Sequence, residues 1–231
     1  MFRHDKKLLH DVKVDRPNPH YAGLMQEQLG GANGELKAGM QYFTQSFRVK
    51  DKRIKDLMLD IAAEEFSHME MVATMINMLN GHDVDPRSTD NGGMTHPQMP
   101  HGNVEASVLG GLTPSIMNAS GFPWTGVYVN STGDLVADLL SDMAAEQRAK
   151  VVYEYLYRQI HDKGVRQTID FLLNREEAHN ALFREALEIV RDTGSNQDFG
   201  TTADSQMYFD LSQPGRYFQN PNQNTGQIQD Q

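Results

Sequence analysis

Four long stretches of the chain carry apolar residues at three- and four-residue steps, which is the period of an α-helix that buries one face. We expect helices at about 21–50, 52–80, 131–163 and 166–193. Residues that cap or end helices mark these stretches: Gly81 and Gly194 follow the second and the fourth, and Ser131 and Thr132 precede the third. The pattern predicts an all-α fold built from four long helices.

A run of glycines interrupts the first stretch. Positions 30–34 read Gly-Gly-Ala-Asn-Gly, and each glycine lowers helix propensity by about 1 kcal/mol. Apolar residues recur at helical spacing after Glu35, at Leu36, Met40 and Phe43. We therefore predict one helix through the run, and we expect the glycines to permit close approach of a neighbouring backbone.

A long connection separates the second and third helices. Residues 81–131 are rich in Gly, Pro, Asn and Met, and a structureless connection of that length is uncommon in a compact domain. Ferritin-like four-helix bundles have one such crossover. We therefore predict a ferritin-like bundle over 21–194 with its crossover at 81–131, an N-terminal extension at 1–20 and a C-terminal tail at 195–231. The polar tail is either disordered or a strap on a neighbouring subunit.

Composition narrows the chemistry. The net charge of −10 argues against unspecific binding to nucleic acid or anionic lipid, because both reward clusters of Lys and Arg. No stretch approaches the roughly 18 apolar residues of a membrane span, and the first residues lack the apolar segment of a secretory signal. We expect no nucleic-acid or membrane partner and a cytoplasmic location. The absence of cysteine leaves only His and carboxylate side chains to hold a metal.

Charged and imidazole side chains stand inside the apolar stripes. The second and fourth stretches each place a Glu and a His, three residues apart, on the buried face, and the other two each place one Glu there. The six residues are Glu35, Glu65, His68, Glu146, Glu176 and His179. Such groups are costly in an apolar interior unless they are neutralised. Two divalent cations would neutralise them, and this ligand set is typical of di-iron and di-manganese carboxylate bundles.

The two halves of the set repeat with a shift of 111 positions. Glu35 and Glu65 are 30 residues apart, as are Glu146 and Glu176. Each first Glu is followed by a basic residue at +2, an Ala at +3 and a Tyr at +7. The basic residues are Lys37 and Arg148, and the tyrosines are Tyr42 and Tyr153. Each tyrosine either packs in the core or donates a hydrogen bond to a site carboxylate. Further glutamates nearby are expected to be solvated or ion-paired: Glu64, Glu70, Glu154 and Glu177.

These residues resemble the manganese catalases, a non-haem family within the ferritin-like fold. The resemblance covers nearly the whole chain, and its strongest segments are 30–36, 60–71, 145–146, 175–179 and 207–213. It implies an enzyme that disproportionates hydrogen peroxide to water and dioxygen at two manganese ions per chain, and it implies a homohexamer. The ligands alone leave other functions open, namely a di-iron oxidase or ferroxidase on the same bundle, or a structural ferritin-like protein.

The resemblance also implies a role for each site residue. Five residues match the family's manganese ligands: Glu35 and His68 on one ion, Glu146 and His179 on the other, and Glu65 bridging both. Glu176 matches an acid–base group that does not bind the metal directly, although its spacing alone would make it a ligand. Tyr42 matches a tyrosine one step out from the first glutamate.

The chain departs from the family pattern beside the third glutamate. Some members carry a basic residue where this chain has Ala145, and others carry a Lys where it has Tyr153; whether Arg148 compensates is left open. Some members also bind calcium at a subunit contact, through two Asp one helical turn apart and a tail segment. The matching residues are Asp56, Asp60, Asp210 and Ser212.

Overall fold

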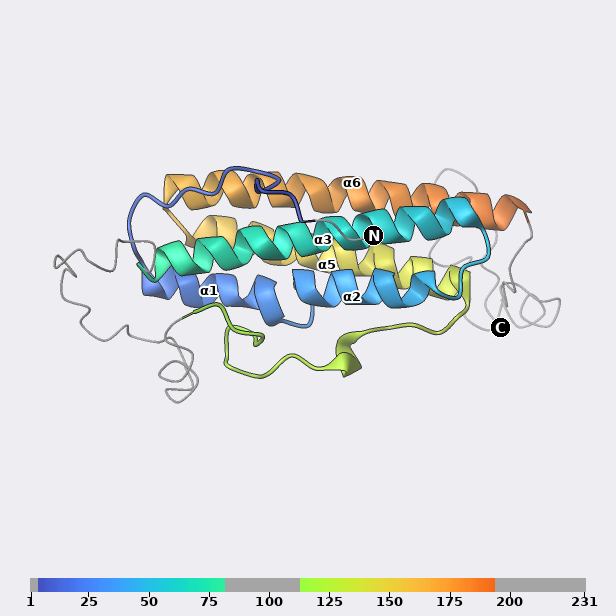
Figure 1. The fold of residues 1–231 in the computed structure, drawn as a ribbon, viewed down its shortest axis with the longest axis horizontal. Coiled ribbons are helices and arrows are strands. Elements are labelled where there is room, and N and C mark those ends of the chain that lie inside the picture. Colours follow the sequence, from blue (N-terminus) through green and yellow to red (C-terminus); the bar gives the residue numbers. More distant parts are fainter. Residues whose placement is uncertain (1–3, 82–112, 194–231) are drawn as a thin grey trace, which may run out of the picture. The chain divides into compact units, whose positions relative to one another are not determined.

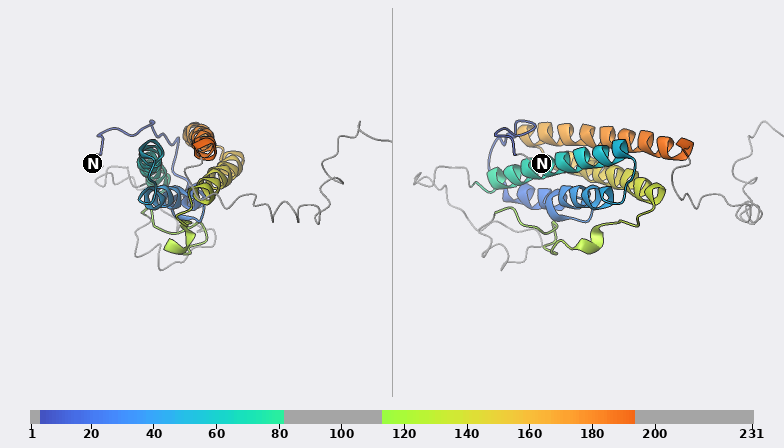
Figure 2. Two further views of the ribbon diagram at one scale, coloured as in Figure 1. Left: turned by 90° about the vertical axis from the view of Figure 1, so that its right-hand side faces the viewer. Right: turned by 45° about the vertical axis from the view of Figure 1, so that its right-hand side comes forward.

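The fold is an all-α bundle. A computed structural model describes residues 4–81 and 113–193 of the chain, and within them the helices are α1 (Pro19–Gly30), α2 (Glu35–Ser46), α3 (Lys52–Leu79), the short η1 (Gly126–Tyr128), α5 (Leu135–Gln159) and α6 (Lys163–Thr193). α1 and α2 lie end to end beside α3, and α5 lies beside α6 (Figures 1 and 2). This arrangement confirms the predicted ferritin-like four-helix bundle, in which α1 and α2 together take the place of the first helix.

The prediction of one continuous helix through the glycine run was wrong. α1 ends at Gly30, and the chain becomes extended at Gly31 and Gly34 before α2 begins at Glu35. A Cβ at Gly34 would lie 2.5 Å from the carbonyl oxygen of Gln28, so the chain turns back against the end of α1 too closely for any side chain. The break makes Glu35 the first residue of α2, where the helix dipole favours a negative charge.

Other helix boundaries shift by a few residues. α3 begins after Asp51, which caps it, and ends before Gly81, whose φ of +81° suits a C-terminal glycine. Asp134 caps α5, not Ser131 or Thr132 as expected. Thr132 instead donates hydrogen bonds to Asp138 through its backbone and its hydroxyl. α6 begins at Lys163, three residues earlier than predicted.

The described part of the crossover packs on α1 and α2. The Gln26 amide of α1 donates to the carbonyls of Ser115 and Met117, and the Gln45 amide of α2 donates to the carbonyl of Asn130 at 2.8 Å. Residues 82–112 and 194–231, which include the expected C-terminal tail, lie outside the described residues. Among the helices that the structure describes, none combines the length and apolar character that crossing a membrane requires.

Two apolar clusters fill the interior, one toward each end of the bundle. The first gathers side chains of α1, the C-terminal part of α3, the C-terminal part of α5 and the N-terminal part of α6, such as Met25, Met75 and Leu172. The second gathers side chains of α2 and the opposite parts of α3, α5 and α6, such as Met58 and Phe183. The six predicted site residues occupy the positions between them, so the polar centre is enclosed by apolar packing on both sides.

The close approach of the crossover to Gly30 can be tested by adding a methyl group. A Cβ at Gly30 would lie 2.4 Å from the Met117 backbone nitrogen and 2.5 Å from its oxygen. We expect Gly30→Ala to destabilise the protein by about 1–3 kcal/mol, which lowers the thermal midpoint by roughly 3–10 °C. Gly126→Ala is the matched control, because a Cβ there meets no atom within 4 Å. Equal midpoints for the two variants in a calorimetric scan would contradict the described packing.

Candidate metal centre

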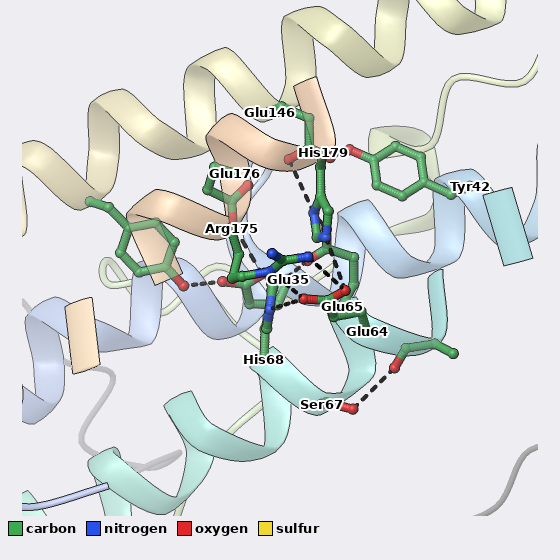
Figure 3. A network of polar contacts seen from close by, with 12 residues as sticks. Glu35, Tyr42, Glu64, Glu65, Ser67, His68, Glu146, Arg175, Glu176 and His179 are labelled. Carbon is green, nitrogen blue, oxygen red and sulfur yellow. Dashed lines mark hydrogen bonds and ion pairs between the residues drawn. The ribbon is translucent and has the colours of Figure 1, made fainter. Parts of the chain in front are cut away.

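Six titratable side chains from four helices meet in the middle of the bundle (Figure 3). α2 contributes Glu35 from its first turn, and α5 contributes Glu146. α3 and α6 each contribute a Glu and a His that lie one helical turn apart on the inner face. None of the six is more than 2% exposed: Glu35, Glu65, His68, Glu146, Glu176 and His179. The structure therefore brings together every residue of the predicted set.

Glu65 is the central residue of the cluster. Its Oε2 lies 3.1 Å from Nδ1 of His68, and its Oε1 lies 2.8 Å from Nδ1 of His179. The two imidazoles are stacked with ring centroids 5.6 Å apart. On the outer side, each Nδ1 lies 3.7 Å from a second carboxylate, that of Glu35 for His68 and that of Glu146 for His179. The Glu65 carboxylate thus lies between two similar groups of potential ligands.

The ligand atoms form two groups, each compact enough to hold one ion. Within each group the atoms lie within 4.8 Å of one another, and Glu65 belongs to both groups. The first group is Glu35, Glu65, His68 and Glu176; the second is Glu65, Glu146 and His179. Geometry therefore places Glu176 beside the potential ligands, as its spacing in the sequence did.

The donor set fits a pair of divalent cations. Several buried atoms of the cluster have no hydrogen-bond partner among the described residues: Oε1 of Glu65, Oε2 of Glu146, Oε1 of Glu176, Nε2 of His68 and both ring nitrogens of His179. Unpartnered buried carboxylates are strongly unfavourable. Carboxylate oxygens combined with imidazole nitrogens suit manganese or iron. Two such ions would satisfy the three carboxylate oxygens and Nδ1 of His179, and they would neutralise four carboxylates.

A carboxylate outside the predicted set orients both imidazoles. Glu64 lies 3.4 Å from Nε2 of His68 and 3.3 Å from Nε2 of His179, and Arg175 donates to it at 2.6 and 3.2 Å. The Nε2 atoms therefore face Glu64 while the Nδ1 atoms face the cluster, so Nδ1 is the atom of each histidine that is placed to bind an ion there. The expected ion pairing of Glu64 is confirmed, but sequence reasoning missed its position under both rings. The sequence did indicate that Glu64 and Arg175 belong together, because they stand at equivalent positions in the two copies of the 111-residue repeat.

Both tyrosines donate hydrogen bonds to site carboxylates. The Tyr42 hydroxyl donates to Glu146, and the Tyr153 hydroxyl donates to Glu35. Both phenols are fully buried. Each tyrosine thus bonds the glutamate of the opposite half of the repeat, so the hydrogen-bonding alternative is confirmed for both residues. The two bonds fix the orientation of the outer carboxylate in each group.

Burial and mutual charge shift the pKa values of the cluster in opposite directions. Burial raises the pKa of Glu35 to about 8, and burial together with the charge of Glu146 raises the pKa of Glu176 well above its usual range. Burial also acts on Glu65, but the two imidazoles outweigh it and hold the pKa of Glu65 below its usual range. For His179 the surrounding carboxylates outweigh burial and raise the pKa to about 12. In the absence of cations the cluster therefore retains protons.

Other predicted residues lie away from the cluster. Asp56 and Asp60 are exposed on α3 and line a surface groove together with Asp5; Asp210 and Ser212 lie outside the described residues. Arg148 is exposed, and its Nε donates to Asn33 at 2.8 Å. This hydrogen bond holds the Arg148 side chain at the surface, away from the buried carboxylates.

Comparison with known proteins gives consistent matches along most of the chain. The model of a family described as manganese containing catalase matches residues 1–216. A probable manganese catalase of Clostridium acetobutylicum is 66% identical over 224 residues, which are 96% of this chain and 95% of the relative. A manganese catalase of Lactiplantibacillus plantarum is 36% identical over 194 residues, 83% of this chain and 73% of the relative.

Solved structures agree with the sequence relatives. The crystal structure of KatB, a manganese catalase from Anabaena PCC7120, superposes with a TM-score of 0.73 at 37% identity and covers 87% of this chain and 86% of that chain. A further sequence relative is protein CotJC of Bacillus subtilis. It is 37% identical over 192 residues, which are 83% of this chain and 96% of the relative.

The protonated cluster predicts that metal binding releases protons. Glu35, with a pKa of about 8, and His179, with a pKa of about 12, hold protons at pH 7 in the metal-free protein, and the pKa of His68 is also raised. Metal ligands must be deprotonated, so binding of Mn²⁺ should release about two to three protons per chain. For the same reason the affinity for Mn²⁺ should increase as pH rises. A pH-stat titration of metal-free protein with Mn²⁺ at pH 7 measures the release. Glu35→Gln should release about one proton fewer, and release of none by the unaltered protein would contradict the assignment.

Proposed function

Because the chain belongs to the manganese-containing catalase family, and is thus an enzyme that disproportionates hydrogen peroxide to water and dioxygen, we propose that the buried cluster is its dinuclear manganese site. The observation that carries this proposal is Glu65, whose two oxygens each face the imidazole of a different group of ligands. A carboxylate in that position can bridge two cations. The two-electron chemistry of peroxide disproportionation calls for such a pair.

Five residues would hold two manganese ions per chain. Glu35 and His68 would bind one ion, Glu146 and His179 the other, and Glu65 both; the two compact groups of ligand atoms support this division. When bound, the ions supply a redox couple that accepts two electrons from one peroxide molecule and returns them to another. The protein's own groups then have to orient the ligands, exclude water and move protons.

Glu176 is proposed as the acid–base group. Its carboxyl is buried beside the first group of ligands, and its raised pKa keeps the proton available near neutral pH. Oxidation of one peroxide to dioxygen releases two protons and two electrons, and cleavage of another to two waters consumes both. Glu176 can give its proton to the peroxide that is cleaved and regain one from the peroxide that is oxidised. Its place among the ligand atoms also suits direct metal binding, so the acid–base role rests on the family resemblance.

Tyr42, Tyr153 and Glu64 are proposed to orient the ligands. Tyr42 holds one oxygen of Glu146 and thereby directs the other oxygen at the cluster. Tyr153 does the same for Glu35. Glu64, neutralised by Arg175, fixes both imidazoles with Nδ1 inward. Glu35, Glu146 and His179 are thus each held by a partner from a different helix, whereas Glu64 holds His68 from within α3.

The function is tested by metal content and dioxygen release. We expect protein purified from manganese-replete cells to contain about two manganese ions per chain and to release dioxygen from hydrogen peroxide. Glu65→Ala should remove most of the metal and the activity, because it deletes the shared ligand. Ser67→Ala, two residues along α3 on a half-buried face, is the control and should retain both. Iron in place of manganese with no dioxygen release would favour a di-iron oxidase, and a stable metal-free bundle would favour a structural protein.

Calcium binding is proposed for Asp56 and Asp60 together with Asp210 and Ser212. The support is that Asp56 and Asp60 are exposed one helical turn apart and line the same groove. Calorimetric titration with Ca²⁺ should detect binding that Asp56→Asn abolishes. Heat of binding that is the same in the variant would refute the assignment.

A homohexamer is proposed for the assembly. The number of subunits rests on the family resemblance. On the described part of the crossover, Phe122 at 66% exposure and Val127 at 85% are apolar side chains that a subunit contact would cover. Sedimentation velocity would measure the mass, and a monomer at micromolar concentration would refute the proposal. A cytoplasmic location remains an expectation from the sequence, which cell fractionation would test.

A further inference from the structure

The surface groove beside Asp56 and Asp60 reaches inward as far as the partners of the two imidazoles. It has a volume of about 1670 Å³, and residues of α2, α3, α6 and the N-terminal segment line it. Glu64 and Arg175 are among these residues, and their side chains are 24% and 34% exposed. The six residues of the cluster itself are at most 2% exposed. The groove therefore brings solvent to Glu64, which lies against both imidazoles.

A row of carboxylates leads along the groove to Glu64. Asp56, Asp60 and Glu64 all line it and are spaced four apart on α3, so they lie along one face of the helix with a rise of about 6 Å from each to the next. The cationic side chains of the groove are Lys7 and Arg175, and two further carboxylates line it, those of Asp5 and Glu70. A hollow surface with such an excess of negative charge concentrates cations from solution.

Buried imidazole nitrogens meet the inner end of this row. Nε2 of His68 and Nε2 of His179 lie 3.4 and 3.3 Å from Glu64. Both side chains are fully buried, and neither Nε2 atom has a hydrogen-bond partner among the described residues. Imidazole nitrogen and carboxylate oxygen are donors that suit manganese. The groove thus ends in the donor chemistry that such an ion prefers.

The N-terminal segment forms a wall of the groove and is fixed to both neighbouring helices. Nε2 of His4 lies 3.1 Å from Glu70 of α3. The ring of His10 stacks on Phe171 of α6 with centroids 4.6 Å apart, and Leu8 packs against the first apolar cluster. The groove is therefore bounded by parts of the chain that are far apart in sequence and anchored to the bundle.

We propose that this groove is the route by which divalent metal ions enter the buried centre. Cations collect at Asp56 and Asp60 and pass along α3 to Glu64, where the incoming ion takes the place of the Arg175 guanidinium beside the imidazoles. Hydrogen peroxide is uncharged near neutral pH, so the row of carboxylates gives it no comparable attraction. The proposal rests on the proposed manganese site, and it concerns how fast that site is filled rather than which residues hold the ions.

The rate of manganese uptake tests the row of carboxylates. The electron paramagnetic resonance signal of free Mn²⁺ is followed after mixing with metal-free protein, without calcium because Asp56 and Asp60 are also the proposed calcium residues. Asp60→Asn removes one charge from the row and should slow uptake by about threefold to tenfold at low ionic strength. The difference should disappear at roughly 0.5 M salt. Glu185→Gln removes a charge from an exposed position of α6 outside the groove and is the matched control, with a change below about 1.5-fold.

Blocking the groove tests the route directly. The chain has no cysteine, so a single one can be introduced at Ser67, which is half-buried and lines the groove. Labelling Ser67→Cys with benzyl methanethiosulfonate places an aromatic group there. The label should slow manganese uptake by about tenfold or more without changing the final manganese content, while unlabelled Ser67→Cys stays within about twofold of the original protein. Ala137→Cys, exposed on α5 and labelled in the same way, is the matched control and should take up manganese at the original rate.

Dioxygen release separates this route from a route for peroxide. Protein that is loaded with manganese first and labelled at Ser67→Cys afterwards should release dioxygen from hydrogen peroxide at the rate of the unlabelled variant. Loss of that activity would assign the groove to peroxide and overturn the proposal. Uptake rates that the label leaves unchanged, or no reaction of the introduced cysteine with the reagent, would overturn it as well. If the unlabelled protein binds no manganese at all, the proposed metal site is refuted together with its route, whereas equal uptake rates with full manganese content refute the route alone.

Discussion

The bundle depends on neutralising four carboxylates in an apolar interior. Glu35, Glu65, Glu146 and Glu176 are almost fully buried between two apolar clusters, and no arrangement of their own hydrogen bonds removes the cost of burying that charge. The two imidazoles lessen it, because their protonation offsets part of the charge in the metal-free protein. Two divalent cations would neutralise all four carboxylates. Metal binding and folding of the central layer would then be coupled, and the apolar clusters at the two ends supply stability that does not depend on the metal.

The cluster is held by partners that reach across the bundle. Each tyrosine bonds the glutamate of the other half of the chain, and Glu64 on α3 joins Arg175 on α6. No helix can shift along its axis without breaking a contact made to another helix. The geometry of the ligands is thus a property of the whole bundle, which is why side chains from four helices keep a common centre.

Much of this could be predicted from the sequence, because helical period and ligand spacing are local. The period placed all six site residues on buried faces, and the repeat paired each ligand with its counterpart in the other half of the chain. The glycine run was misjudged. The helical spacing of the apolar residues suggested one helix, whereas the chain turns back at this point and brings Gly34 against the backbone of Gln28. The position of Glu64 beside both imidazoles and the burial of Lys37 escaped prediction, because charged residues on a helix are usually solvated. Only the packing of the helices shows where these two side chains lie.

The pair formed by Glu64 and Arg175 limits the symmetry of the molecule. The two residues occupy the same position in the two copies of the repeat, yet they carry opposite charges and bond each other. Two identical copies of the helical hairpin would set two like charges against one another at this point. The two halves of the bundle are therefore not interchangeable, and the molecule has a polarity that perfect internal symmetry forbids.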